Sequence, residues 1–229
     1  MPGKLLSIII PVYNEEKVVA ASLQSVLDLE INKEIVVVND GSTDATGRIL
    51  SDPRYQHAFK LITQPTNKGK GVAIKRGLEE IRGDYFIVCD ADLEYDPVDI
   101  IKLFLEAEKE DDSNSAFYGS RFLNKKPLVF HYFVNKFLTG FTNFLFKSHL
   151  TDMETCFKLI PSAALPKLNL SGGRFEIEPE ITAQLLKNGY KIKELPISYF
   201  RRGYREGKKI KAKDGILALK TLIRERFFR

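Results

Sequence analysis

Residues 85–94 read Tyr85-Phe-Ile-Val-Cys-Asp90-Ala-Asp92-Leu-Glu94, an apolar run that leads into three carboxylates at alternate positions. Strands covered on both faces of a sheet show continuous apolar runs, so the first half predicts a buried strand. In an extended chain alternate side chains share a face, so we expect Asp90, Asp92 and Glu94 to converge beyond the strand. Oxygen ligands favour hard cations. The segment therefore predicts a site for Mg²⁺ or Mn²⁺.

The same acids also fit a polar turn between the strand and a helix. Asp96-Pro97 is typical of a helix start, with the aspartate as the cap and proline in the first turn. On the segment alone, both interpretations stay open.

On both sides of this segment, short apolar runs alternate with stretches whose apolar residues have helical spacing. Residues 5–10 and 34–38 are short β-branched runs, and residues 15–29 between them have apolar positions at helical spacing, with Asn14 as a plausible cap. The later pattern predicts helices at 44–50, 71–81 and 97–109 and strands at 59–63, 115–119 and 155–160. Such alternation predicts an α/β fold, an open and mostly parallel sheet flanked by helices, with ligands at the carboxyl ends of its strands.

Composition bounds the rest. With 229 residues, 44% hydrophobic and 28% charged, the chain can build one substantial core, with a possible appended subdomain. We divide it into a domain at 1–200 and a segment at 201–229. No cleavage site follows Met1, so we expect a cytoplasmic protein. Cys89 and Cys156 lack CxxC spacing, which favours a reduced, buried pair.

Positive charge gathers at the C-terminus. Residues 201–229 hold eleven Lys or Arg against three acids, a local charge of +8, whereas the other 200 residues hold 24 against 27, or −3. Such a segment can attract nucleic acid, anionic lipid or a phosphorylated substrate, or can simply be a solvated helix face. No nucleic-acid-binding module is recognisable, so we expect no nucleic-acid partner.

Polar clusters follow the first two predicted strands as well. Residues 11–15 read Pro-Val-Tyr-Asn-Glu, and residues 39–44 read Asn-Asp-Gly-Ser-Thr-Asp. The second cluster fits a tight turn and helix cap, yet an acid at the end of a second α/β strand is also placed to bind a ribose or base, which makes Asp40 a candidate. No GxGxxG follows the first strand, and Gly69-Lys-Gly71 does not fit a P-loop.

The order of four motifs resembles the family 2 glycosyltransferases, which have the GT-A fold. They are Ser7–Glu16, Val36–Asp44, Asn67–Gly71 and Asp90-Ala-Asp92. Four later stretches, Gly119–Arg121, Leu150–Lys158, Phe175–Glu180 and Glu206–Lys209, resemble the branch typified by dolichol-phosphate mannosyltransferase. The resemblance implies inverting, metal-dependent transfer of mannose or glucose from GDP-mannose or UDP-glucose to a polyprenyl phosphate. A transferase of the same fold that acts on a polysaccharide or protein is the alternative.

The resemblance also implies roles for the parts of the chain. Residues 1–200 would be the catalytic domain, with a nucleotide-sugar-binding half at 1–120 and an acceptor half at 121–200 that includes residues 128–146. Asp90, Asp92 and Glu94 would hold the metal, with Glu94 where relatives can have Gln, and Asp92, Arg121 and Arg202 would be catalytic. The residues expected to contact donor or acceptor are Pro11, Tyr13, Glu15, Val38, Asp40, Lys70, Asp90, Ala91, Asp92, Glu94, Arg121, Arg201, Arg202 and Lys208. Because a lipid phosphate is already largely dianionic at neutral pH, no strong base is required. Asp152 and Glu154 remain unassigned.

Two segments suggest a lipid surface. In residues 128–146, thirteen of nineteen residues are apolar or Gly and six are Phe, which fits an interfacial helix or a core helix equally. In the C-terminal segment one helical face carries Ile216, Leu219, Ile223 and Phe227, beside the basic residues Lys213, Lys220, Arg224 and Arg226. We expect a peripheral protein on the cytoplasmic face of a membrane, and the sequence predicts no oligomeric state.

Overall fold

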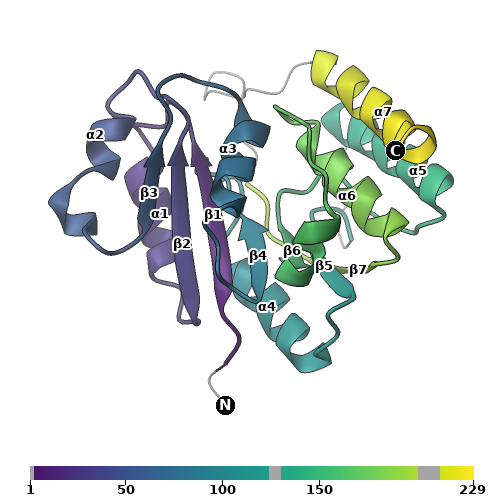
Figure 1. Cartoon of the computed structure of the whole chain (residues 1–229), viewed down its shortest axis with the longest axis horizontal. Helices are drawn as coiled ribbons and strands as arrows, with labels where there is room; N and C mark the ends of the chain where they lie inside the picture. Colours follow the sequence, from purple (N-terminus) through teal and green to yellow (C-terminus); the bar gives the residue numbers. More distant parts are fainter. Residues whose placement is uncertain (1–2, 124–129, 201–211) are drawn as a thin grey trace.

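A computed structural model describes residues 3–123, 130–200 and 212–229 of the chain (Figure 1). Its seven-stranded sheet has the order β3-β2-β1-β4-β6-β5-β7. The strands are β1 Leu6–Val12, β2 Lys33–Asn39, β3 Lys60–Thr63, β4 Tyr85–Val88, β5 Ser115–Ser120, β6 Lys158–Pro161 and β7 Lys191–Pro196. The helices are α1 Val19–Leu27, α2 Thr46–Leu50, α3 Lys70–Leu78, α4 Val98–Glu110, α5 Phe130–Phe146, α6 Ile177–Lys187 and α7 Ala212–Phe227, with short 3₁₀ turns at Pro53–Tyr55 and Ser162–Lys167.

The first four strands form the parallel half that the alternating pattern predicts. β1 pairs with β2 and β4, and β2 pairs with β3, all in parallel. β1 and β4 are buried almost throughout, because helices cover both faces of the sheet. Their carboxyl ends therefore lie along one edge, where the predicted ligand site belongs.

Beyond β4 the sheet changes direction. β6 pairs antiparallel with both β4 and β5, while β7 pairs parallel with β5. β4 and β5 are therefore not neighbours, although they are consecutive in the chain. The prediction of a mostly parallel α/β sheet is confirmed, but the insertion of an antiparallel strand depends on pairing between distant segments that no local pattern records.

The first helix begins later than its apolar spacing predicts. α1 starts at Val19, and Asn14 does not cap it. Asn14 has a positive φ of 50° and its Oδ1 accepts a hydrogen bond from the Thr43 N–H at 2.8 Å. Asn14 thus joins the loop after β1 to the loop after β2.

The described residues form three apolar clusters, the smallest of which is Val36, Val38 and Ala73 between β2 and α3. The largest one surrounds the sheet and includes both cysteines, which are buried and carry no disulfide. A second cluster joins helices from the end of the molecule opposite α2, where Figure 1 shows α5, α6 and α7 together. Its buried members are Leu138, Leu145, Leu150, Met153, Ala183, Ala218 and Leu222. α7 is therefore packed against the same core as α5 and α6.

α5 and α7 each have a buried face and an exposed apolar face. On α5, Leu138 and Leu145 are buried while Phe133, Phe137 and Phe144 are exposed. On α7, Ile216, Ile223 and Phe227 are exposed as the sequence predicts, but Leu219 packs on the second cluster. The core interpretation of the Phe-rich helix is therefore confirmed for one of its faces, and the interfacial interpretation of the other face stays a prediction. None of the helices in the described ranges is long and apolar enough to cross a membrane.

Two neighbouring residues test the packing of α7. Leu222→Ala should lower the free energy of unfolding by about 2–5 kcal/mol, because it leaves a cavity among the three helices. Ile223→Ala changes an exposed side chain and should cost no more than about 0.5 kcal/mol. Urea unfolding followed by circular dichroism measures both. Equal losses for the two variants would contradict the packing described above.

Candidate functional site

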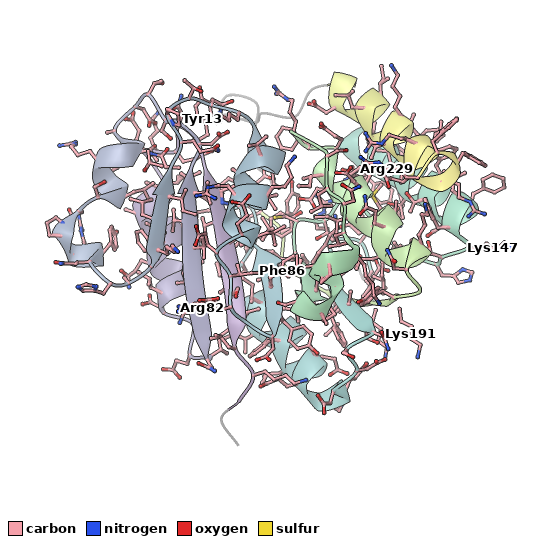
Figure 2. All side chains as sticks on the ribbon, viewed as in Figure 1. Tyr13, Arg82, Phe86, Lys147, Lys191 and Arg229 are labelled. Carbon is pink, nitrogen blue, oxygen red and sulfur yellow. The ribbon has the colours of Figure 1, made fainter. Side chains whose placement is uncertain are left out.

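The carboxyl ends of β1, β2 and β4 form one edge of the parallel half. Val12 pairs with Asn39, and Ile9 pairs with Val88, so the segments that follow these three strands emerge side by side. Figure 2 labels Tyr13 at this edge. The polar clusters that the sequence places after the three strands are therefore brought together.

The three alternate carboxylates are not gathered into one group in this structure, and their role as metal ligands stays a prediction. Among the residues that the structure describes, no three His, Cys, Asp or Glu side chains are placed as a metal-binding group. β4 ends at Val88 and the chain then turns, with Leu93 at a positive φ of 58°. Alternation holds only for an extended chain, so it cannot be carried past the end of the strand.

Asp92, Glu94 and Asp96 each accept a hydrogen bond from a different group. The Asp92 Oδ1 atom accepts a hydrogen bond from the Glu94 N–H at 3.0 Å, which closes a turn. The Glu94 Oε2 atom accepts one from the Tyr199 hydroxyl at 2.6 Å, and this ties Glu94 to the segment after β7. Asp96 accepts from the Val98 N–H at the start of α4. The turn interpretation is therefore correct for the backbone of this segment.

Lys70 is the cation at the centre of this edge. Its Nζ lies 2.8 Å from Asp90 Oδ2 and 3.1 Å from Glu178 Oε1, and only 13% of the side chain is exposed. Burial alone would lower the pKa of Lys70, but the carboxylates of Asp90 and Glu178 raise it well above its usual value. Lys70, predicted as a ligand contact, is thus a charged ammonium beside the first acid of the Asp90-Ala-Asp92 motif.

Asp40 holds the loop that leads to Lys70. Its Oδ1 atom accepts hydrogen bonds from the Gln64 amide and the Lys68 N–H, and its Oδ2 atom accepts one from the Gly69 N–H, each at 2.8 Å. The side chain is buried. Asp40 therefore braces the start of α3, and its contact with a ribose or base stays a prediction.

The other predicted donor contacts differ in exposure. Pro11 is the second-last residue of β1, and Tyr13 and Glu15 follow in the loop after it. All three are partly exposed. Val38 and Ala91 are buried in apolar clusters, so their side chains support the edge from inside and do not line it. Any contact of these two with a ligand would involve the backbone.

Arg121 forms a nearly buried ion pair with Asp152, just after β5. Its Nε and Nη2 atoms donate to the two carboxylate oxygens of Asp152 at 2.7 and 2.8 Å, and its guanidinium lies near the rings of Tyr95, Phe122 and Tyr199. Burial would lower the pKa of Arg121, but Asp152 raises it well above its usual value. The sequence predicted an arginine facing the acceptor phosphate; the structure shows a nearly buried one held by Asp152. Asp152 is therefore engaged by Arg121 in this structure, and it stays without an assigned catalytic role.

Lys158 and Glu178 lie in the motifs Leu150–Lys158 and Phe175–Glu180, but the sequence predicts no role for either residue. Lys158 Nζ lies 2.6 Å from Glu178 Oε2, so Glu178 joins Lys158 to Lys70. Glu154 is near both Lys158 and Arg121, and burial raises its pKa to about 7. Its Oε1 atom has no hydrogen-bond partner among the described residues. The signal for Glu178 was the Phe175–Glu180 motif itself, but its partners depend on tertiary packing.

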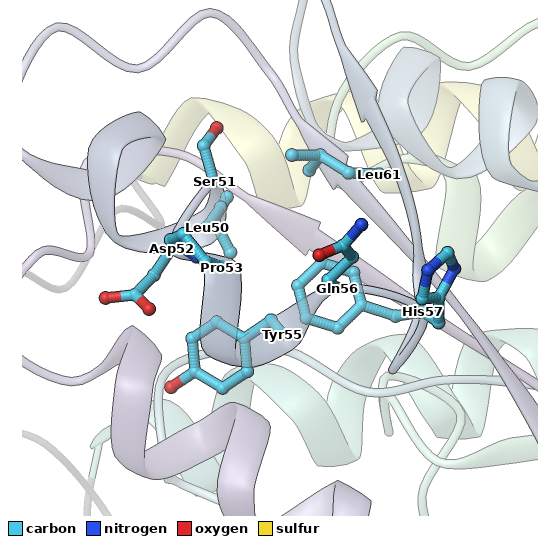
Figure 3. Close-up of a pocket in the computed structure, with 9 residues that line it drawn as sticks. Leu50, Ser51, Asp52, Pro53, Tyr55, Gln56, His57 and Leu61 are labelled. Carbon is cyan, nitrogen blue, oxygen red and sulfur yellow. The ribbon is translucent and has the colours of Figure 1, made fainter.

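Three predicted residues, Arg201, Arg202 and Lys208, lie outside the described residues. A depression of about 370 Å³ lies elsewhere, between α2 and β3, and Figure 3 shows its lining. It is lined by residues 50–61, including Tyr55, His57 and Phe59, and by none of the predicted site residues. The carboxyl edge of the sheet remains the candidate site.

The chain is similar to known proteins over most of its length. The model of the family described as Glycosyl transferase family 2 matches residues 7–168. A dolichyl-phosphate beta-glucosyltransferase of Trichomonas vaginalis is 31% identical over 217 residues, which cover 85% of this chain. The chain spans 65% of that relative's length, less than two thirds.

Two further proteins resemble parts or the shape of the chain. A poly-beta-1,6-N-acetyl-D-glucosamine synthase of Staphylococcus epidermidis is 34% identical over 126 residues, which cover 54% of this chain and 30% of the synthase. The crystal structure of glucosyl-3-phosphoglycerate synthase from Mycobacterium tuberculosis, in complex with Mn²⁺, UDP and phosphoglyceric acid, superposes with a TM-score of 0.74. It covers 99% of this chain and 80% of its own at 16% identity, so it shows a shared fold.

The raised pKa of Glu154 predicts a pH dependence of stability. The folded state keeps this proton up to about pH 7, whereas the usual value is 4.5, so the folded state binds more protons in between and loses stability as pH rises. Glu154→Gln should remove that loss, and its advantage over the wild type should grow by about 1–3 kcal/mol from about pH 5 to about pH 8.

Urea unfolding at several pH values measures this difference. Glu79→Gln, which changes a surface carboxylate, is the matched control and should show no such trend. A constant difference between Glu154→Gln and the wild type would contradict the raised pKa.

Proposed function

The chain belongs to glycosyltransferase family 2 and has its GT-A fold, and from this premise we propose that it transfers a hexose from a nucleotide sugar to a polyprenyl phosphate. The observation that supports this most directly is the group of Lys70, Asp90 and Glu178 at the carboxyl edge of the parallel strands. This edge is where open α/β sheets bind nucleotides, and it lies mainly within the matched residues.

The acceptor is inferred from the extent of the similarity. The relative named for a dolichyl-phosphate acceptor aligns with 217 residues and so includes both halves of the sheet. The relative named for polysaccharide synthesis aligns with only 126 residues. A shared acceptor requires a shared acceptor half, so the longer alignment favours a lipid phosphate over a polysaccharide.

The donor is inferred less directly. The relative is named a glucosyltransferase, and the structurally similar synthase was crystallised with UDP, so we favour UDP-glucose over GDP-mannose. Lys70 would place a positive charge beside the diphosphate, where Asp90 holds the ammonium in position.

The acids that follow β4 suit a divalent metal ion. Asp90, Asp92 and Glu94 offer hard carboxylate oxygens but form no complete cage in this structure, which suits Mg²⁺ or Mn²⁺ that completes its shell with donor phosphates and water. We propose that Asp90, Asp92 and Glu94 would supply its protein ligands. When bound, such an ion would neutralise the leaving diphosphate.

The reaction needs little from a general base. The acceptor phosphate, with a second pKa near about 6, is largely a dianion at neutral pH. One of its oxygens would attack the anomeric carbon as the bond from that carbon to the nucleoside diphosphate breaks, which predicts inversion. The side chains would contribute by orienting the two phosphorylated reactants and offsetting their repulsion.

Transfer to lipid is the first test. We expect the protein with Mg²⁺ or Mn²⁺ to transfer radiolabelled glucose from UDP-glucose to a short polyprenyl phosphate, and Asp92→Ala to lower the rate by about 100-fold or more. Asp96→Ala, four residues along, is the matched control and should retain activity. GDP-mannose in place of UDP-glucose tests the sugar, and transfer only to polysaccharide or protein would refute the lipid acceptor.

We also propose that α5 and α7 rest on the cytoplasmic face of a membrane. Thirteen large hydrophobic side chains are exposed among the described residues, and eight of them lie on α5, on α7 or at Phe228. Lys220 and Arg226 are exposed on α7 between these apolar positions, which suits anionic lipid head groups. A polyprenyl acceptor would be presented at the same surface.

Substitution tests this better than deletion, because removing residues 215–229 would also remove Leu222 from the core. The double variant Phe137→Ser with Ile223→Ser should bind anionic liposomes about tenfold or more weakly in co-sedimentation, since each side chain loses its burial in lipid. Leu105→Ser, which changes an exposed leucine on α4, is the control. Equal co-sedimentation of all three proteins would contradict the proposed surface.

A further inference from the structure

The end of α7 closes over a buried cluster of charges. Glu180 of α6 and Glu225 of α7 are almost completely buried. Arg224 Nη2 donates to Glu180 Oε1 at 2.7 Å and to Glu225 Oε1 at 3.0 Å, and Arg229 Nη1 lies 3.3 Å from the same two oxygens. Two carboxylates face two guanidiniums, and Glu180 of α6 has both of its arginine partners only while α7 is in place. The sequence places Arg224 among the residues expected to meet lipid head groups, and the structure adds that its guanidinium pairs with Glu180 and Glu225.

The same carboxylates hold residues 169–173, which we call the glycine loop. Glu180 accepts hydrogen bonds from the Ser171 N–H and hydroxyl and, at 2.7 Å, from the Gly172 N–H. Gln184 exchanges two hydrogen bonds with the backbone of Asn169 and donates to Glu225 Oε2 at 3.1 Å. The conformation of the glycine loop therefore depends on the cluster beneath α7.

The glycine loop in turn lies against the start of α3. The Gly173 carbonyl accepts a hydrogen bond from the Val72 N–H at 3.3 Å. A Cβ atom on Gly69 would lie 2.4 Å from the Gly173 oxygen, and one on Gly71 would lie 2.5 Å from the Gly172 oxygen. Gly69 also has a φ of +99°, which favours glycine. The two glycines that flank Lys70 thus allow the loop to touch the helix end that carries the site's ammonium.

A second connection runs through the first turn of α6. Glu178 contacts Lys70 there, while Glu180, two residues later, contacts α7. Any shift of this turn would move both carboxylates. Lys70 is therefore held from two sides, by the glycine loop and by Glu178, and both supports are anchored by the cluster.

We propose that Arg224 and Arg229 are positioning residues for the donor site, and that the seating of α7 sets the affinity of Lys70 and Asp90 for a nucleoside diphosphate. Because such coupling is reciprocal, donor binding would also stabilise α7 in its seated position. This inference uses the proposed function only for the identity of the ligand. It links the helix that carries the exposed apolar face to the site at the carboxyl edge.

The test compares four variants in nucleotide binding. We expect Arg224→Ala and the milder Arg229→Ala to weaken binding of UDP with Mn²⁺, measured by calorimetry, by about 3- to 30-fold. Arg224→Lys should restore part of the affinity, because an ammonium can still face the two carboxylates. Arg54→Ala removes an exposed ion pair with Asp52 and should change nothing. In turnover assays the KM for the donor should rise more than kcat falls.

Hydrogen exchange separates this inference from the proposed function. In folded Arg229→Ala, amide exchange should accelerate in the glycine loop and at Val72, whether or not a ligand is identified. Wild-type affinity for UDP in both alanine variants, together with unchanged exchange at Val72, would overturn the inference. If the wild type binds neither UDP nor GDP, the proposed function fails, and the exchange measurement alone then decides whether α7 controls the start of α3.

Discussion

The structure around the candidate site depends on one buried ammonium between two carboxylates. Lys70 lies 2.8 Å from Asp90 and 3.1 Å from Glu178, and each of these three residues comes from a different part of the chain. A buried lysine without partners would lose its charge, and two acids without the lysine would repel each other. The three segments therefore fix one another, and this contact joins the parallel half of the sheet to the half beyond β4.

The close packing around Lys70 also restricts which residues can flank it. Gly69 and Gly71 flank Lys70 because carbonyl oxygens of the glycine loop lie where their Cβ atoms would be. On the other side of Lys70, Asp40 accepts hydrogen bonds from the N–H groups of Lys68 and Gly69, just before α3. Asp40 and Asp90, both predicted to contact the nucleotide sugar, thus also fix the position of the Lys70 ammonium.

The parallel half could be predicted from the sequence because its signals are local. β1, β2 and β4 are apolar runs with helical segments between them, and their ends carry the polar clusters that meet at one edge. What the sequence could not show has a physical cause. The alternation of Asp90, Asp92 and Glu94 applies to an extended chain, and β4 ends at Val88. The pairing of β6 with β4 and the ion pair of Arg121 with Asp152 join distant segments, which no periodicity records.

Helical periodicity was also insufficient for α5 and α7, because apolar residues occur on more than one face of each. In α7, Leu222 is buried, Ile223 is exposed and Arg224 turns to Glu180, three different environments at successive positions. Successive helical residues point about 100° apart. The exposed apolar side chains of α7 and the side chains that hold it to α6 therefore belong to one rigid helix, and a movement of one face moves the other. A change on the outer face of α7 must therefore either leave the helix seated or disturb the charges that hold the glycine loop.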